Sequence, residues 1–308
     1  MSPVTVGVSL KMYFGHERAR AWFDEVADRV REHPGVRSGA VELFITPTYL
    51  QVLPAVAAFA GTPVRIGGQD VSAEDPGAFT GEVSAAELAE VGATIAEIGH
   101  AERRRLYGET EDVTAAKTRA ALRAGLTPLL CIGETERQEP ADAAAVAVAQ
   151  LRSALEGADA GAVIVAYEPV WAIGAPEPAG HEHIRTVTAA LRQAVEADAA
   201  RDGSAVIYGG AAGPGLLTAL GDAVDGVFLG RFAHDPAALV AVLDEAEALA
   251  ALRQAQGPID TDPENWVAEP VEAPRPETAA LRQAQGPIHT DPASRIAAQG
   301  PATSKDAS

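Results

Sequence analysis

The chain of 308 residues carries 43 acidic and 24 basic side chains, a net charge of -19 at neutral pH. This charge argues against binding nucleic acid or an anionic membrane through bulk electrostatics, but it allows a local positive pocket for a small anion. No apolar run approaches the roughly 20 residues of a membrane-spanning helix. The single cysteine, Cys131, has no disulfide partner and Lys11 interrupts the first apolar run, so we expect a cytoplasmic protein without a signal peptide.

Short apolar runs alternate with helix-like segments along residues 1–250, matching a (β/α)8 barrel in count and length. The expected strands are Val4–Leu10, Val41–Ile45, Val64–Gly67, Thr94–Ile98, Thr127–Ile132, Ala162–Ala166, Ala205–Tyr208 and Gly226–Leu229. The expected helices include Glu17–Arg31, Ala85–Val91, Val113–Ala124, Ala141–Leu155, Ile184–Ala199 and Pro236–Leu249. An open doubly wound sheet is the alternative. Such a sheet usually has fewer strands and, when it binds dinucleotides, a GxGxxG turn where this chain has Ser9-Leu10-Lys11.

The composition changes in residues 251–308, which hold eight of the 21 prolines. The stretch ALRQAQGPIDTDP at 251–263 returns as ALRQAQGPIHTDP at 280–292. Two copies are too few for a solenoid, which needs about three. Because the segment is rich in proline and poor in large apolar residues, we expect a disordered tail that follows a barrel domain of residues 1–250. We assign this tail no function.

The stretch Val163–Gly174, VIVAYEPVWAIG, combines a buried strand with a carboxylate just past its end. That carboxylate, Glu168, is expected to be partly desolvated, which raises a carboxyl pKa toward the range useful for a general base. The alternative is a solvated loop glutamate. Pro169 restricts the backbone after the strand and Gly174 frees it, so residues 169–178 have the character of a lid.

Several other chemistry-bearing residues follow predicted strands. In a (β/α)8 barrel, function collects at the C-terminal ends of the strands. Lys11, His100, Gly209-Gly210 and Gly230 all stand there with Glu168. Taken singly, they are better explained as a surface charge, a satisfied polar residue and turn-forming glycines. Together, a base, an imidazole, an ammonium and glycine-rich backbone suit proton abstraction next to the carbonyl of a phosphorylated substrate.

Over residues 1–250 the chain resembles the triose-phosphate isomerase family. The matching stretches are GAFTGEVS (77–84), IGHAERR (98–104), CIGE (131–134), AYEPVWAIG (166–174) and YGG (208–210). The resemblance implies that Glu168 is the base, that His100 polarises the carbonyl, that Lys11 supplies positive charge and that the following loop closes over the phosphate, without a cofactor. It also implies supporting roles for Glu102, Arg103 and Thr80, and a homodimer in which the loop around Thr80 enters the neighbouring subunit.

The departures from the family pattern fall on positions that would hold substrate. Ser9 stands where the family usually has Asn, Ala101 and Ala211 where it has Ser, and Gly230-Arg231 where it has paired glycines. The lid tip reads Ala175-Pro176-Glu177 in place of Thr-Gly-Lys. The opening GVSLKMYFG is similar to that of family members that isomerise erythrulose phosphates. We therefore expect a four-carbon ketose phosphate as substrate, bound by Ser9, Gly174, Gly209, Gly210, Ala211, Gly230 and Arg231.

Two other functions are possible: a triose-phosphate isomerase, and a catalytically inactive barrel that binds a metabolite. The joint presence of base, imidazole and ammonium argues against the inactive barrel, because a binding module has no need of a base. His181 and His183 resemble a metal pair, but at this spacing near a helix start the imidazoles diverge, so we expect no metal site. Cys131, at the end of a strand, is expected to be a buried structural thiol.

Overall fold

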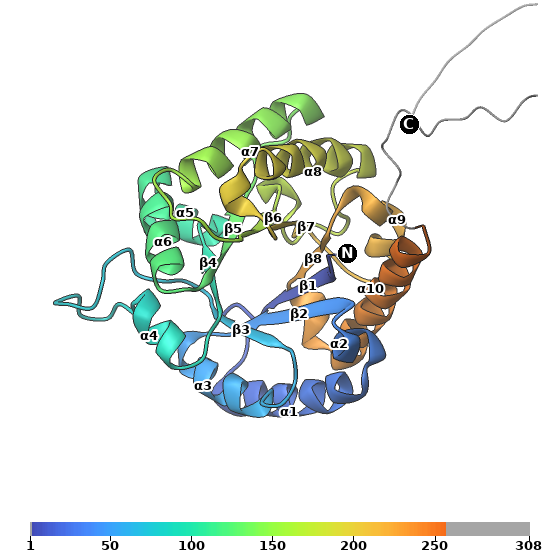
Figure 1. Cartoon of the computed structure of the whole chain (residues 1–308), viewed down its shortest axis with the longest axis horizontal. Helices are drawn as coiled ribbons and strands as arrows, with labels where there is room; N and C mark the ends of the chain where they lie inside the picture. Colours follow the sequence, from blue (N-terminus) through green and yellow to red (C-terminus); the bar gives the residue numbers. More distant parts are fainter. Residues whose placement is uncertain (1, 257–308) are drawn as a thin grey trace, which may run out of the picture. The chain divides into compact units, whose positions relative to one another are not determined.

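The computed structural model describes residues 2–256. Eight parallel strands form a closed barrel in chain order, surrounded by helices (Figure 1), which confirms the predicted (β/α)8 architecture. The strands are β1 (Val4–Ser9), β2 (Val41–Thr46), β3 (Arg65–Gly68), β4 (Ile95–Ile98), β5 (Thr127–Ile132), β6 (Ile164–Tyr167), β7 (Ala205–Tyr208) and β8 (Gly226–Leu229).

The barrel closes where β1 pairs with β8, Thr5 opposite Gly226. A Cβ on Gly226 would meet the Thr5 carbonyl oxygen at 1.7 Å, so only glycine fits this closure. Inside the barrel, Phe44 stacks on Phe228 with ring centroids 5.7 Å apart. Phe44 also fills the space beside Gly7, where a Cβ would lie 2.1 Å from its ring. The barrel is therefore a packed core and no channel, which leaves its C-terminal face for a site.

The helices pack outside the strands through a second apolar layer. They are α1 (His16–Glu32), α2 (Pro34–Ser38), α3 (Tyr49–Ala58), α4 (Ala85–Glu90), α5 (Ala101–Tyr107), α6 (Glu111–Arg123), α7 (Pro140–Ala154), α8 (His181–Glu196), α9 (Leu216–Leu220) and α10 (Pro236–Gln256). The sequence patterns did not indicate α2, α3, α5 and α9. Three of these are too short for a clear period, and α3 carries Pro54 in its interior.

The last helix extends beyond the predicted domain boundary at residue 250. Arg253 of α10 donates to the Asp222 carboxylate at 2.9 Å and to the Val224 carbonyl at 2.8 Å, so the final turns still contact the barrel. The predicted disorder of the tail concerns mainly residues 257–308, which lie outside the described part of the chain. None of the helices within residues 2–256 is long and apolar enough to cross a membrane.

The loop of residues 69–84 between β3 and α4 extends away from the barrel (Figure 1). It carries Thr80, which is exposed, and Phe79, with 46% of its surface exposed. A projecting loop with an exposed aromatic ring at its end is typical of a segment that packs against another molecule.

Candidate active site

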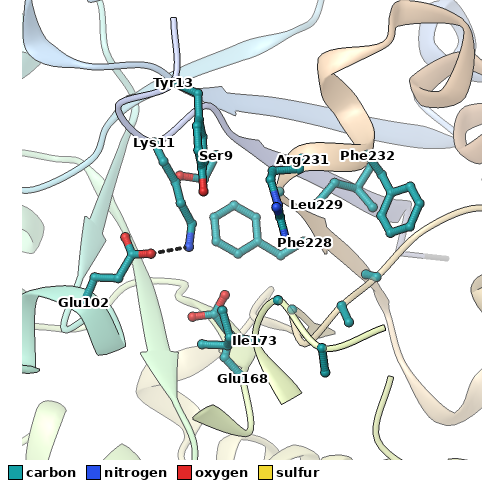
Figure 2. Close-up of a pocket in the computed structure, with 16 residues that line it drawn as sticks. Ser9, Lys11, Tyr13, Glu102, Glu168, Ile173, Phe228, Leu229, Arg231 and Phe232 are labelled. Atoms are coloured by element: carbon teal, nitrogen blue, oxygen red, sulfur yellow. Dashed lines mark hydrogen bonds and ion pairs between the residues drawn. The ribbon is translucent and has the colours of Figure 1, made fainter. Parts of the chain in front are cut away.

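The C-terminal ends of the strands surround a cavity of about 280 Å³, a size that suits a small metabolite. Figure 2 shows side chains from several strand ends around this cavity. The residues predicted from the sequence that line it are Ser9, Lys11, Glu102, Glu168, Gly174, Gly209, Ala211, Gly230 and Arg231. Tyr13, Ile173, Phe228 and Phe232 line it as well. Sequence reasoning missed these four because an apolar or aromatic side chain after a strand is not distinguished from core.

Glu168 follows β6 and is buried, with 5% of its surface exposed, so it is not a solvated loop residue. Burial, together with the negative charge of Glu97, raises the pKa of Glu168 to about 8, while the positive charge of Lys11 acts in the opposite direction. Its Oε2 atom has no hydrogen-bond partner among the described residues. A buried carboxylate that has a raised pKa and one oxygen without a hydrogen-bond partner is suited to accept a proton from carbon.

His100 is the N-cap residue of α5, and this position determines which ring nitrogen carries the proton. Its Nδ1 accepts a hydrogen bond from the backbone N–H of Glu102 at 3.1 Å, so the proton of the neutral ring lies on Nε2. Burial lowers the pKa of His100 to about 4, and the positive charge of Lys11 lowers it as well. The imidazole is therefore neutral, and its Nε2 atom lies 3.6 Å from Glu168 Oε2, although His100 itself is not among the residues that line the cavity.

Lys11 stands in the left-handed region with a φ of 47°, a conformation that is strained for a residue with a side chain. Its Nζ lies 2.8 Å from Glu102 Oε1, and Gln69 Nε2 donates to its carbonyl at 3.0 Å. Burial acts to lower the pKa of Lys11, but the hydrogen bond and charge of Glu102 outweigh burial and raise it. The side chain therefore holds a fixed positive charge that points into the cavity toward Glu168 (Figure 2).

A model of the triosephosphate isomerase family matches residues 4–246. The chain belongs to the triose-phosphate isomerase family. It is accordingly an isomerase, as its family relatives are.

Two relatives show the span of activities named within the family. L-erythrulose-1-phosphate isomerase of Pectobacterium atrosepticum is 49% identical over 247 residues, covering 79% of this chain and 95% of that protein. Triosephosphate isomerase of Leifsonia xyli subsp. xyli is 41% identical over 243 residues, covering 76% and 93%. The crystal structure of triosephosphate isomerase from Bartonella henselae matches with a TM-score of 0.68 at 28% identity, over 80% of this chain and 99% of that one.

The glycines after β7 make room for the base of this family member. A Cβ on Gly209 would lie 2.7 Å from both Cγ and Oε1 of Glu168. The Gly209 N–H donates to the Tyr167 carbonyl at 2.9 Å, so it is already engaged within the barrel. Gly210 does not line the cavity, and a Cβ there would meet the Tyr208 hydroxyl at 2.6 Å. Packing alone therefore explains why residues 209 and 210 are glycines, independently of any role in phosphate binding.

Arg231 begins the short helix η4 (Arg231–His234) after β8 and projects into the cavity beside Phe228 (Figure 2). Within residues 2–256 its guanidinium forms no ion pair. It approaches the lid, because a Cβ on Gly174 would lie 3.7 Å from its Nη2 atom. Gly174 itself has a φ of 73°, which a residue with a side chain rarely adopts. A cation without a carboxylate partner therefore lies beside the lid at the cavity.

A buried carboxylate anchors the start of the lid. Glu134 accepts hydrogen bonds from Trp171 Nε1 at 2.8 Å and from the Tyr167 hydroxyl at 3.1 Å. His183 Nε2 lies 3.0 Å from the same carboxylate, whereas His181 is exposed. The two histidines therefore face different surroundings, as their spacing predicts. The CIGE motif marked Glu134 in the sequence, but nothing in the sequence indicated that these three aromatic rings converge on it.

Arg103 and Thr80 lie outside the cavity. Arg103 pairs with Asp70 at 2.7 Å and with Glu109 at 2.6 Å, and Lys117 contacts the same two carboxylates. This buried charge cluster ties the start of the β3–α4 loop to α5 and α6. Arg103 is thus placed to support the loop rather than to touch substrate.

Two buried residues stand close to the base. Cys131 is buried, which agrees with the predicted structural thiol, and burial raises the pKa of its thiol well above the ordinary value. Glu97, in the middle of β4, is 3% exposed. Sequence reasoning passed over Glu97, although a lone acidic residue in the otherwise apolar strand Ile95–Ile98 is an available signal.

Proposed function

We propose that the chain isomerises a four-carbon ketose phosphate by moving a proton between adjacent carbons. In this mechanism Glu168 removes a proton from the carbon next to the carbonyl. His100 donates from Nε2 to the carbonyl oxygen, and the Lys11 ammonium stabilises the negative charge that develops there. Glu168 then returns its proton to the former carbonyl carbon, while His100 Nε2 takes the proton of the hydroxyl on the carbon first deprotonated. That carbon becomes the product carbonyl, both residues regain their starting protonation, and no atom is gained or lost.

The observation that carries this proposal is the buried Glu168 carboxylate at the cavity, whose Oε2 has no hydrogen-bond partner among the described residues and lies 3.6 Å from Nε2 of the neutral His100. A raised carboxyl pKa makes the base stronger, and a lowered imidazole pKa keeps the ring neutral so that it can donate its proton. A binding module would gain nothing from either arrangement, because an uncompensated buried carboxylate costs stability. The inactive barrel is therefore disfavoured.

The substrate class rests on the cavity and on the relatives. Arg231 offers a guanidinium without an ion-pair partner within residues 2–256, and a guanidinium can bind two phosphate oxygens at once. The Pectobacterium relative, whose name specifies an erythrulose phosphate, is 49% identical, whereas the Leifsonia relative named for triose phosphate is 41% identical. A triose phosphate is the second candidate substrate.

The deciding experiment compares both substrate classes under one set of conditions. We expect kcat/KM for an erythrulose phosphate to exceed that for glyceraldehyde 3-phosphate by at least about tenfold, roughly the effect of one well-placed polar contact. Proton exchange from D2O into each ketose phosphate reports the abstraction step directly. If neither compound exchanges its proton, the hypothesis of a catalytically inactive barrel is favoured over that of an isomerase.

We further infer a homodimer that assembles through the face carrying the β3–α4 loop. Large apolar side chains are exposed on this loop and on the stretches that neighbour it: Phe79 in the loop, Met12 after β1 (90% exposed), and Leu50 (88%) and Leu53 (60%) on α3. Exposed apolar side chains of this size favour contact with a second copy. Sedimentation of the wild-type chain and of Phe79→Glu tests the dimer, and a monomeric wild type would disprove it. A sugar phosphate substrate also accords with the expected cytoplasmic location.

A further inference from the structure

The buried carboxylate of Glu97 accepts hydrogen bonds from two hydroxyl groups of other strands, and one of these hydroxyl groups belongs to Ser9, which lines the cavity. Glu97 Oε2 accepts a hydrogen bond from Thr46 Oγ1 of β2 at 2.8 Å and one from Ser9 Oγ of β1 at 3.3 Å. Since these partners come from β1 and β2, neither of which pairs with β4, the Glu97 side chain points into the barrel from β4. All three residues are buried, and only Ser9 lines the cavity.

This contact determines what Ser9 can offer to a ligand. A serine hydroxyl has one proton to donate and lone pairs that accept. Because the Ser9 proton is directed to Glu97, Ser9 presents only lone pairs to the cavity. A ketone oxygen only accepts hydrogen bonds, so it cannot bond to the lone pairs of Ser9. Lys11 and His100 already supply hydrogen-bond donors for that oxygen. Ser9 is therefore suited to a hydroxyl group of the ligand and not to its carbonyl.

We propose that Glu97 is a positioning residue that fixes Ser9 as the acceptor for the additional hydroxyl of a four-carbon sugar phosphate. The inference rests on the proposed function for the class of ligand. Ser9 occupies the position where family resemblance leads us to expect the longer asparagine, so the site gains both space for another carbon and an acceptor for its hydroxyl. The residue that touches the ligand is Ser9, and Glu97 acts through it.

Glu97 performs this role when it is ionised. Burial raises the pKa of Glu97 to about 7, against the hydrogen bonds from Thr46 and Ser9 and the positive charge of Lys11, which lower it. The negative charge of Glu102 raises the pKa of Glu97, and the Glu168 carboxylate also interacts with Glu97 through its charge. A measurement at pH 8.5 therefore examines the state in which the carboxylate accepts from both hydroxyls.

The test compares two dissociation constants and does not depend on turnover. The binding ratio is the Kd of the three-carbon compound divided by the Kd of the four-carbon compound. Calorimetry at pH 8.5 compares erythritol 4-phosphate, which carries the additional carbon and hydroxyl, with glycerol 3-phosphate. We expect the wild-type chain to bind the four-carbon compound about fivefold more tightly or better, as expected for one hydrogen bond. Both Glu97→Met and Ser9→Ala should bring the ratio close to one. The double variant should match Ser9→Ala alone, because Glu97 acts only through Ser9.

Thr46→Val is the matched control, since it removes the other hydroxyl on Glu97 and leaves the Ser9 contact in place. Its binding ratio should stay at the wild-type value. If Glu97→Met does not fold, Glu97→Gln keeps the shape and exchanges an ionised acceptor for a weaker neutral one, which should lower the ratio by a smaller factor.

Three results overturn the inference. They are a wild-type ratio near one, an unchanged ratio in the folded Glu97 variant, and a further fall when the Glu97 variant is combined with Ser9→Ala. Failure of the proposed function looks different, because it appears as absent proton exchange in the wild-type chain whatever the binding ratio.

Discussion

Gly209 leaves the space in which the side chain of Glu168 lies. A Cβ at residue 209 would be 2.7 Å from Cγ and Oε1 of that carboxylate, well inside van der Waals contact. The clash falls on the end of a side chain, so Gly209→Ala should displace Glu168 at little cost to folding. We expect kcat to fall by about tenfold or more, because a displacement of about 1 Å can cost two orders of magnitude.

Gly15→Ala is the control for this substitution. Gly15 has an ordinary φ of -69° and no atom within 4 Å of an added Cβ. Its kcat and melting temperature should stay near those of the wild type. A normal kcat in Gly209→Ala would mean that displacing the Glu168 side chain does not impair catalysis. The space needed by Glu168 would then not explain why residue 209 is glycine.

Glu168→Gln should reduce turnover far more than substrate binding. The amide keeps the shape of the carboxylate but cannot accept a proton from carbon, and general bases contribute about 10²- to 10⁴-fold. We expect kcat to fall at least about 10²-fold while KM changes little, measured in steady state with an erythrulose phosphate. Glu90→Gln on α4 alters an exposed acid that does not line the cavity and should have nearly wild-type kcat. Comparable turnover in the two variants would remove Glu168 from the mechanism.

The pH profile of kcat/KM should report the ionisation of Glu168. The base is active when deprotonated, and burial raises its pKa to about 8. Activity should therefore decline as the pH falls below about 8, approaching a tenfold loss per pH unit. Glu97→Gln removes a negative charge that raises this pKa, so the midpoint should move to lower pH. A wild-type midpoint near 4.5, the ordinary value, would contradict the buried environment of the base.

The sequence predicted the eight strands and the positions of the catalytic candidates because both depend on local patterns. A run of β-branched residues identifies a buried strand, and the parallel barrel brings all strand ends to one face. Lys11, Glu102 and Glu168 therefore meet at one cavity, although up to 157 residues separate them (168 − 11).

Contacts across the barrel were beyond sequence reasoning. The bond between Ser9 and Glu97 joins β1 to β4, and its partners are chosen by strand register and side-chain direction. The convergence of Tyr167, Trp171 and His183 on Glu134 likewise depends on how α8 packs beside β6. Helix α3 was not predicted, because its period is weak and its proline argues locally for a break.

The end of the barrel can be located by truncation. A chain that ends at Gln256 should melt like the full-length protein if the tail adds nothing to the fold, as we propose. A chain that ends at Ala250 loses the bonds of Arg253 to Asp222 and Val224, and should be less stable by roughly 1–3 kcal/mol. Arg253→Ala in the full chain should reproduce most of this loss. Equal melting temperatures for the two truncations would show that the last turns of α10 contribute nothing.

Arg231 offers the sharpest test of substrate choice. Its guanidinium lies at the cavity without an ion-pair partner among the described residues, beside the lid residue Gly174. We propose that it grips the phosphate group and so shifts the pocket in favour of a four-carbon ketose phosphate. Arg231→Gly restores the glycine expected from the family, and should lower kcat/KM for an erythrulose phosphate by at least about tenfold while the value for glyceraldehyde 3-phosphate changes less.

Arg231→Lys separates charge from geometry in this position. Lysine keeps the positive charge but lacks the planar pair of donors, so it should recover part of the loss caused by glycine and less than all of it. Inhibition by inorganic phosphate should weaken in the same order, from wild type through Arg231→Lys to Arg231→Gly. Wild-type activity on triose phosphate that equals or exceeds the four-carbon activity, and that is unaffected by Arg231→Gly, would refute this role.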